Sequence, residues 1–214
     1  MNDRNRRPPR PTRRLGNLLL AGVLAGLPAC ASSGIAHNNQ PQADAPPPKA
    51  PQAAVSKIAR PGPQHKRLEA LIGNWNAVSS AWPHRGEPVE EGKGTLSNFW
   101  MLDGRFVGQE YKSKSKDPPY QGLGALGYDN VKHLYTSVWL DTAGTAVLTS
   151  LGSCDKTGKV FTLKGRLNDP TTGKPVRTKS ITRIVDPKTY TFELFKDDAD
   201  GKMFKTLHIT YTRK

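Results

Sequence analysis

Two acidic residues, Asp129 and Asp141, stand at the ends of neighbouring strand-like segments, close to Tyr128 and Trp139. A pair of carboxyl groups beside an aromatic ring can act as general acid and general base, as a hydrolase or an isomerase requires. Aspartate at a strand end is also a common turn former, because its side chain accepts hydrogen bonds from the backbone two residues further on. We favour the turn interpretation and keep the acid–base pair as the alternative.

Histidine is the next residue type that could do chemistry here. Haem-binding barrels of the nitrobindin type place a histidine inside, which makes His133 and His208 the residues to consider. In the last strand-like segment, however, His208 lies on the face opposite Leu207 and Ile209, so it faces solvent if the apolar face is inward. We expect no cofactor and no metal site, with haem on His208 or His133 as the alternative.

The segment Gly122–Gly127, "GLGALG", matches the G-x-G-x-x-G pattern of dinucleotide-binding turns. In those proteins the glycines open a helix whose N-terminus holds the pyrophosphate. Here Tyr128 and Asp129 follow, then a turn and another strand-like segment. We therefore interpret the match as coincidental and the glycines as a bend or bulge in a strand. No lipase, zinc-protease or P-loop motif occurs either.

The segments that must position these residues are short, rich in β-formers and separated by turn signals, of which Asp103-Gly104 is the strongest. They predict about ten strands, at residues 75–82, 94–101, 105–112, 120–128, 133–140, 145–153, 159–167, 176–185, 190–196 and 203–213. Loops this short join neighbouring antiparallel strands. The predicted fold is all-β, a single up-and-down barrel of about ten strands, with a short helix around residues 68–72 before the first strand.

A barrel of this size can hold one small ligand in its interior. Five aromatic residues are the candidates for its lining, although alternation leaves the inward face of their strands open: Trp82, Trp100, Tyr128, Tyr135 and Trp139. We expect the ligand to be a small apolar or amphipathic molecule.

Gly73, Trp75 and Arg213 indicate how the barrel closes. Gly73 lets the helix meet the first strand without a Cβ clash, and Trp75 can plug one end. Since the first and last strands pair in a closed meander, Arg213 can lie across the Trp75 ring. This G-x-W and terminal Arg arrangement resembles the calycin architecture of lipocalins and fatty-acid-binding proteins.

A closer resemblance covers nearly all of residues 65–214. The stretches "LEALIGNW", "LDGRFV", "GLGALGYDNVKHLYTSVWLDT", "DPTTGKPVRTKSITRIVD" and "ITYTRK" are similar to the bacterial family called domain of unknown function 1579. The resemblance implies a fold and a bacterial origin, and it supplies no catalytic residues.

The N-terminal part has the composition of an export segment. Residues 1–29 combine an Arg-rich stretch with the apolar run "LLLAGVLAGLPA", which is too short to span a bilayer. "LPAC" resembles a lipobox, which predicts acylation of Cys30 and an outer-membrane lipoprotein in a Gram-negative cell; the alternative is cleavage after Ala31, giving a soluble periplasmic or secreted protein. Residues 30–63 are rich in Pro, Ala and Gln and predict a disordered tether, followed by a barrel domain at 64–214.

The chain has 214 residues and a net charge of +14. Residues 1–29 account for +5 and residues 30–63 for +2, which leaves +7 on the barrel domain. That charge does not make it a nucleic-acid-binding protein, and we expect contact with a membrane only through the lipid anchor. The hypothesis is an exported lipoprotein that binds a small ligand; the alternatives are a barrel enzyme, which we consider less favoured, and a structural envelope module. The oligomeric state stays open.

Overall fold

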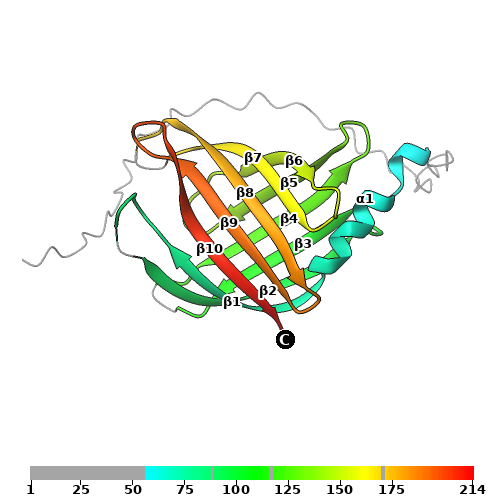
Figure 1. The fold of residues 1–214 in the computed structure, drawn as a ribbon, viewed down its shortest axis with the longest axis horizontal. Coiled ribbons are helices and arrows are strands. Elements are labelled where there is room, and N and C mark those ends of the chain that lie inside the picture. Colours follow the sequence, from blue (N-terminus) through cyan, green and yellow to red (C-terminus); the bar gives the residue numbers. More distant parts are fainter. Residues whose placement is uncertain (1–55, 88, 116–117, 170–171) are drawn as a thin grey trace, which may run out of the picture. The chain divides into compact units, whose positions relative to one another are not determined.

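The protein is described by a computed structural model over residues 56–214, except 88, 116–117 and 170–171 (Figure 1). Its strands are β1 (Gly73–Ala81), β2 (Glu90–Met101), β3 (Phe106–Ser113), β4 (Gln121–Asp129), β5 (Leu134–Asp141), β6 (Leu148–Cys154), β7 (Val160–Asn168), β8 (Pro175–Asp186), β9 (Thr189–Asp197) and β10 (Met203–Arg213). All neighbouring strands are antiparallel, and β1 pairs with both β2 and β10. The predicted all-β, ten-stranded closed meander is therefore confirmed.

Closure follows from the register between the first and last strands. Trp75 stands opposite Arg213 and Ala81 stands opposite Leu207, so the two strands pair over their whole shared length. Because every strand has a neighbour on both sides, the barrel leaves no edge open for pairing with another chain. Closure also separates an inside from an outside along all ten strands.

A short helical segment covers one end of the barrel, which we call the helix end. It consists of η1 (Lys57–Ala59), α1 (Pro63–Lys66) and η2 (Arg67–Leu71), and Figure 1 shows it lying against the barrel. The Leu71 carbonyl accepts hydrogen bonds from Trp75 Nε1 at 2.9 Å and from Asn98 Nδ2 at 2.8 Å. None of the helices in the described part of the chain has the length and apolar character needed to span a bilayer.

The packed core lies beneath this segment. Leu68 and Phe161 are fully buried, and Trp75 packs edge-on against Tyr190 with ring centroids 4.7 Å apart. Tyr190 in turn stacks on Tyr211, with ring centroids 4.5 Å apart. Burial of these large rings is the main apolar contribution to stability at this end.

Arg213, at the end of the last strand, is joined to the start of the first strand. Its guanidinium carbon lies 4.2 Å from the centroid of the Trp75 ring, and its Nη1 donates a 2.8 Å hydrogen bond to the Ile72 carbonyl. Gly73 has a φ of +130°, and a Cβ there would overlap the Arg213 guanidinium. The expected contact between Arg213 and Trp75 is present, and Gly73 is needed chiefly for the arginine rather than for the helix.

The N-terminal expectations fall mostly outside the described residues, which begin at 56. Residues 1–29, Cys30 and most of the expected tether are among those outside. The last part of that tether contacts the barrel, because Asn130 Nδ2 donates hydrogen bonds to the carbonyls of Ile58 and Arg60.

Replacing Arg213 with methionine should weaken barrel closure. The variant loses the cation–π contact and the hydrogen bonds to the Ile72 and Pro187 carbonyls. We expect the free energy of unfolding, measured with urea, to fall by about 1–2 kcal/mol. Lys188→Met is the control, since Lys188 is exposed and joins no ion pair within the described residues. Equal losses in the two variants would contradict this role of Arg213.

Candidate functional site

The inward face of every strand follows from alternation and register. Trp75, Leu96, Val107, Tyr135 and Phe161 are all buried, and the residues that pair with them or lie two positions along share their face. Towards the helix end these inward residues are large and closely packed. The other end of the barrel carries the loops after β1, β3, β5, β7 and β9, and we call it the open end. The inward residues there differ in size and burial from those at the helix end.

The inward residues nearer the open end are small, polar or only half buried. Nine of them keep partial exposure although they point into a closed barrel: Ser79, Ala81, Ser137, Trp139, Leu148, Ser180, Phe192, Leu194 and Leu207. Solvent reaches such inward positions from the open end of the barrel. We call this region the open half; it combines an apolar wall on β9 and β10 with serine hydroxyls on β1, β5 and β8.

Trp139 and Asp141 form a polar cluster on the inward face of β5. Asp141 Oδ2 accepts hydrogen bonds from Tyr120 Oη at 3.0 Å and from Trp139 Nε1 at 3.1 Å. Tyr111 packs edge-on against Tyr120 with ring centroids 5.7 Å apart, and its hydroxyl is hydrogen-bonded to Ser79. Burial raises the pKa of both tyrosines, so they remain neutral hydroxyls at physiological pH.

Glycines make room for these rings. A Cβ at Gly122 or Gly124 would overlap the Trp139 ring, and a Cβ at Gly94 would overlap the Tyr111 hydroxyl. Gly122 and Gly124 do not form the bulge that was one of the two expectations, because β4 pairs with β3 and β5 without any register shift. Both glycines face inward, and the indole of Trp139 lies across them.

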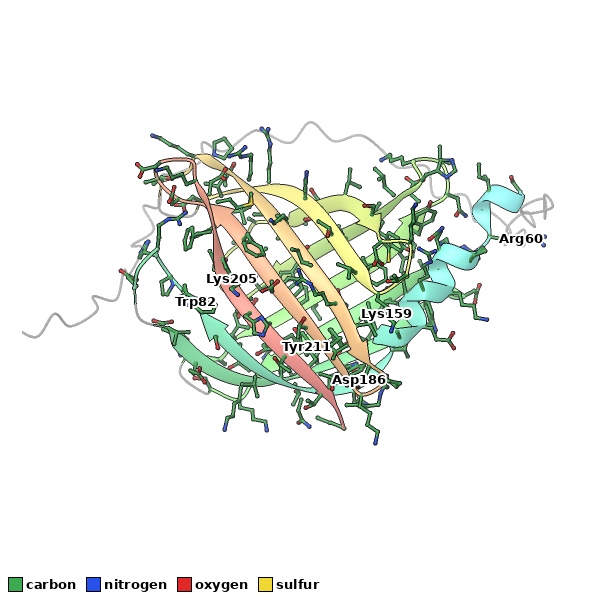
Figure 2. All side chains as sticks on the ribbon, in the orientation of Figure 1. Arg60, Trp82, Lys159, Asp186, Lys205 and Tyr211 are labelled. Atoms are coloured by element: carbon green, nitrogen blue, oxygen red, sulfur yellow. The ribbon has the colours of Figure 1, made fainter. Side chains whose placement is uncertain are left out.

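The five candidate lining aromatics do not come together. Tyr128 and Tyr135 face inward and pack edge-on with ring centroids 4.9 Å apart, but they belong to the packed region at the helix end. Trp100 pairs with Val107 at that same end and is 36% exposed, so it lies at the rim. Trp82 follows β1 at the open end, where Lys205 lies over its ring (Figure 2).

Trp139 is therefore the one candidate in the open half, and two of its neighbours were missed. Tyr111 lies on β3, which pairs with β4, and Tyr120 immediately precedes β4. The available signal was the pair of glycines two residues apart, since glycines on one face of a strand leave space for a large ring from the next strand.

The two candidate carboxyl groups lie at opposite ends of the barrel. Asp129 ends β4 at the helix end and Asp141 ends β5 at the open end, about 25 Å apart along a strand of this length. Asp129 Oδ1 accepts hydrogen bonds from the backbone of Val131 and Lys132, as a turn former does. The two groups cannot act as an acid–base pair; Asp141 alone reaches the interior.

Neither of the histidines considered for haem faces the interior. His133 is exposed in the turn after β4, and His208 lies on the outer face of β10, 3.7 Å from Glu193. His65 is buried, but its Nδ1 accepts a hydrogen bond from the Gly62 backbone and its ring is also bonded to the Tyr128 backbone. Of His65, His133 and His208, none presents a free imidazole to the barrel interior.

The family model described as "Protein of unknown function (DUF1579)" matches residues 60–213. The chain belongs to this family. The match covers the whole barrel together with α1 and η2, and it confirms the resemblance seen in the sequence. No curated protein matches the chain closely enough to count as a relative.

Solved structures resemble the barrel in fold. One described as "Crystal Structure of Rv2717c from M. tuberculosis" has a TM-score of 0.56 and 17% identity, covering 72% of this chain and 99% of that one. A redesigned β-barrel, b11L5F_LGL, has a TM-score of 0.38 and 13% identity over 69% of this chain and 95% of that one. One described as "Structure of EF1p2_mFAP2b bound to DFHBI" has a TM-score of 0.39 and 14% identity over 71% of this chain and 99% of that one. The first likeness supports the fold alone.

Gly122→Ala should displace the Trp139 ring. The new methyl group would overlap the indole, so the ring must leave its place or the strands must separate. We expect a loss of about 1–3 kcal/mol in the free energy of unfolding and an altered near-ultraviolet circular dichroism spectrum. Gly144→Ala is the matched control, because the nearest atom to a Cβ there is 3.9 Å away. An unchanged spectrum in Gly122→Ala would show that Trp139 does not lie across β4.

Proposed function

We propose that the family member described here binds one small amphipathic molecule in the open half of its barrel. The observation that carries the proposal is the partial exposure of inward apolar side chains, above all Leu194 and Leu207, in a barrel whose strands are all paired. Apolar groups that face inward and remain wetted gain free energy when an apolar ligand covers them. The helix end is filled with packed rings, so the ligand enters from the open end.

The two walls of the open half suit two parts of such a ligand. Phe192, Leu194 and Leu207 offer an apolar surface to a hydrocarbon body. Across the interior, Tyr120, Trp139 and Asp141 form a connected hydrogen-bond cluster. A polar head group bonded to these residues would be oriented by a few fixed polar atoms within a mostly apolar site, as small-molecule sites generally are.

The Asp141 carboxylate is held by more than the cluster. Its Oδ1 accepts a 2.9 Å hydrogen bond from the Ala143 backbone, while Tyr120 and Trp139 share Oδ2. This leaves one of about four acceptor positions of the carboxylate unused. A ligand head group that donates a hydrogen bond therefore fits this site better than one that only accepts.

Filling the entrance should abolish binding. Ala81 and Ser80 are neighbours on β1, but Ala81 faces inward opposite Leu207 and Ser80 faces outward opposite His208. An anilinonaphthalene sulfonate probe should bind the wild type at 1:1 stoichiometry with a gain in fluorescence. We expect Ala81→Trp to lose both, and Ser80→Trp to bind the probe with an affinity within twofold of the wild type. Far-ultraviolet circular dichroism checks that both variants fold. Equal binding by the two variants would place the probe on the outer surface and refute the proposal.

We also propose that the chain is an exported lipoprotein carried to the cell envelope by residues 1–29 and acylated on Cys30. The support is the order of an Arg-rich stretch, a short apolar run and "LPAC" in the sequence. The Pro-rich residues that follow would hold the barrel away from the membrane surface.

Cys30→Ser should release the protein from the membrane fraction. The wild type is expected to incorporate a labelled fatty acid and to sediment with membranes, and the variant to do neither. Cys154→Ser is the control, because Cys154 is a half-buried thiol at the end of β6. A wild-type protein that carries no acyl group and begins after Ala31 would support the alternative cleavage site.

A further inference from the structure

Four cationic residues stand together on the outer wall of β7 and β8. Lys164 lies directly opposite Lys179, and Arg166 lies directly opposite Arg177, in the register of the two strands. Cross-strand partners are about 5 Å apart and positions two residues apart on a strand are about 7 Å apart, so the four positions form a small rectangle. Like charges placed directly opposite each other destabilise a sheet.

The side chains on β8 lean away from those on β7. Arg177 forms a 2.7 Å ion pair with Asp197 on β9, and Lys179 Nζ lies 4.4 Å from the centroid of the Phe195 ring, also on β9. Lys164 and Arg166 are exposed and have no ion-pair partner within the described residues. One carboxylate therefore accompanies four cations, and three positive charges remain uncompensated.

A trough runs between the two rows of side chains. Its cavity has a volume of about 640 Å³, and its floor consists of Ser150, Gly165 and Thr178 on three adjacent strands. One side is formed by the outward row Leu151, Lys164 and Lys179, and the other by the row Thr149, Arg166, Arg177 and, beyond Asp197, Met203. In Figure 1 the strands β6, β7 and β8 that carry the trough lie side by side.

We propose that this trough binds a phosphate monoester group. A dianionic phosphate offsets most of three uncompensated positive charges, and its oxygens suit the paired N–H donors of Arg166. The cavity is larger than one phosphate, and Leu151 and Met203 at its edges are 43% and 36% exposed. These apolar side chains would contact the organic part of the ester. This site is separate from the open half of the interior and does not depend on the function proposed there.

The test measures binding of phosphate compounds to the full-length protein and two double variants. Lys164→Gln with Arg166→Gln removes the two unpaired cations of the trough. Lys93→Gln with Lys112→Gln removes two exposed cations from β2 and β3 and is the charge-matched control. The soluble probes are inorganic phosphate and glycerol 3-phosphate, followed by calorimetry. The lipid probe is a vesicle of phosphatidylcholine with one fifth phosphatidic acid, compared with a vesicle of phosphatidylcholine alone.

We expect the wild type to bind phosphate compounds at least about tenfold more tightly than the trough variant does. The affinity of the control variant should stay within twofold of that of the wild type. Trough-dependent binding of glycerol 3-phosphate identifies a soluble ester as the ligand; trough-dependent binding of phosphatidic acid vesicles alone identifies a lipid head group. Absence of binding by the wild type to every probe, or equal losses in both variants, overturns the proposal.

A second measurement does not require the ligand. Since the cations of the trough repel one another, Lys164→Gln should raise the Tm of the ligand-free protein while weakening phosphate binding. A residue whose role is only to stabilise the fold would lower the Tm when replaced. A lower Tm for Lys164→Gln in the absence of phosphate contradicts the uncompensated cluster on which the proposal rests.

Discussion

The pairing of β1 with β10 holds the barrel together. β1 and β10 are separated by most of the domain in sequence, and their pairing closes the sheet. Arg213 fixes that closure by joining the Ile72 and Pro187 carbonyls and covering the Trp75 ring. Gly73 leaves the space that the guanidinium occupies. Without this closure the inward residues would face solvent and no interior would exist.

The two ends of the closed barrel differ in how their inward residues pack. At the helix end, Trp75, Tyr190 and Tyr211 pack against one another and against the helical cover. At the open end, inward apolar side chains such as Leu194 and Leu207 remain partly exposed. A protein selected for stability alone would bury that apolar surface. This surface is therefore the part of the fold that a bound ligand would best explain.

Much of the fold could be predicted from the sequence. Alternation of apolar residues and turn signals such as Asp103-Gly104 gave ten strands in a meander, and Gly73, Trp75 and Arg213 indicated how it closes. Alternation assigns residues to the two faces of one strand. The position of a residue along the barrel axis depends on the register between strands, which comes from tertiary packing. That is why Tyr128 and Tyr135 were grouped with Trp139, although they lie at the other end.

The dependence on the register between strands also explains the other predictions that the structure does not bear out. Asp129 and Asp141 end strands that are adjacent in sequence, but antiparallel strands end at opposite edges of a sheet. Gly122 and Gly124 were assigned to a bend because the ring that covers them belongs to another strand. The four cationic residues on β7 and β8 likewise come together through the register between the strands. The sequence of either strand alone does not show that Lys164 lies opposite Lys179.

The proposed occupant of the open half is a single molecule. Native mass spectrometry of the protein, after incubation with single-chain amphiphiles whose head groups differ in hydrogen-bond donors, tests this proposal. We expect a saturating adduct of one amphiphile per protein, strongest for head groups that donate a hydrogen bond to Asp141. If every amphiphile left the protein free, or bound in several copies without saturation, the open half would not be a binding site.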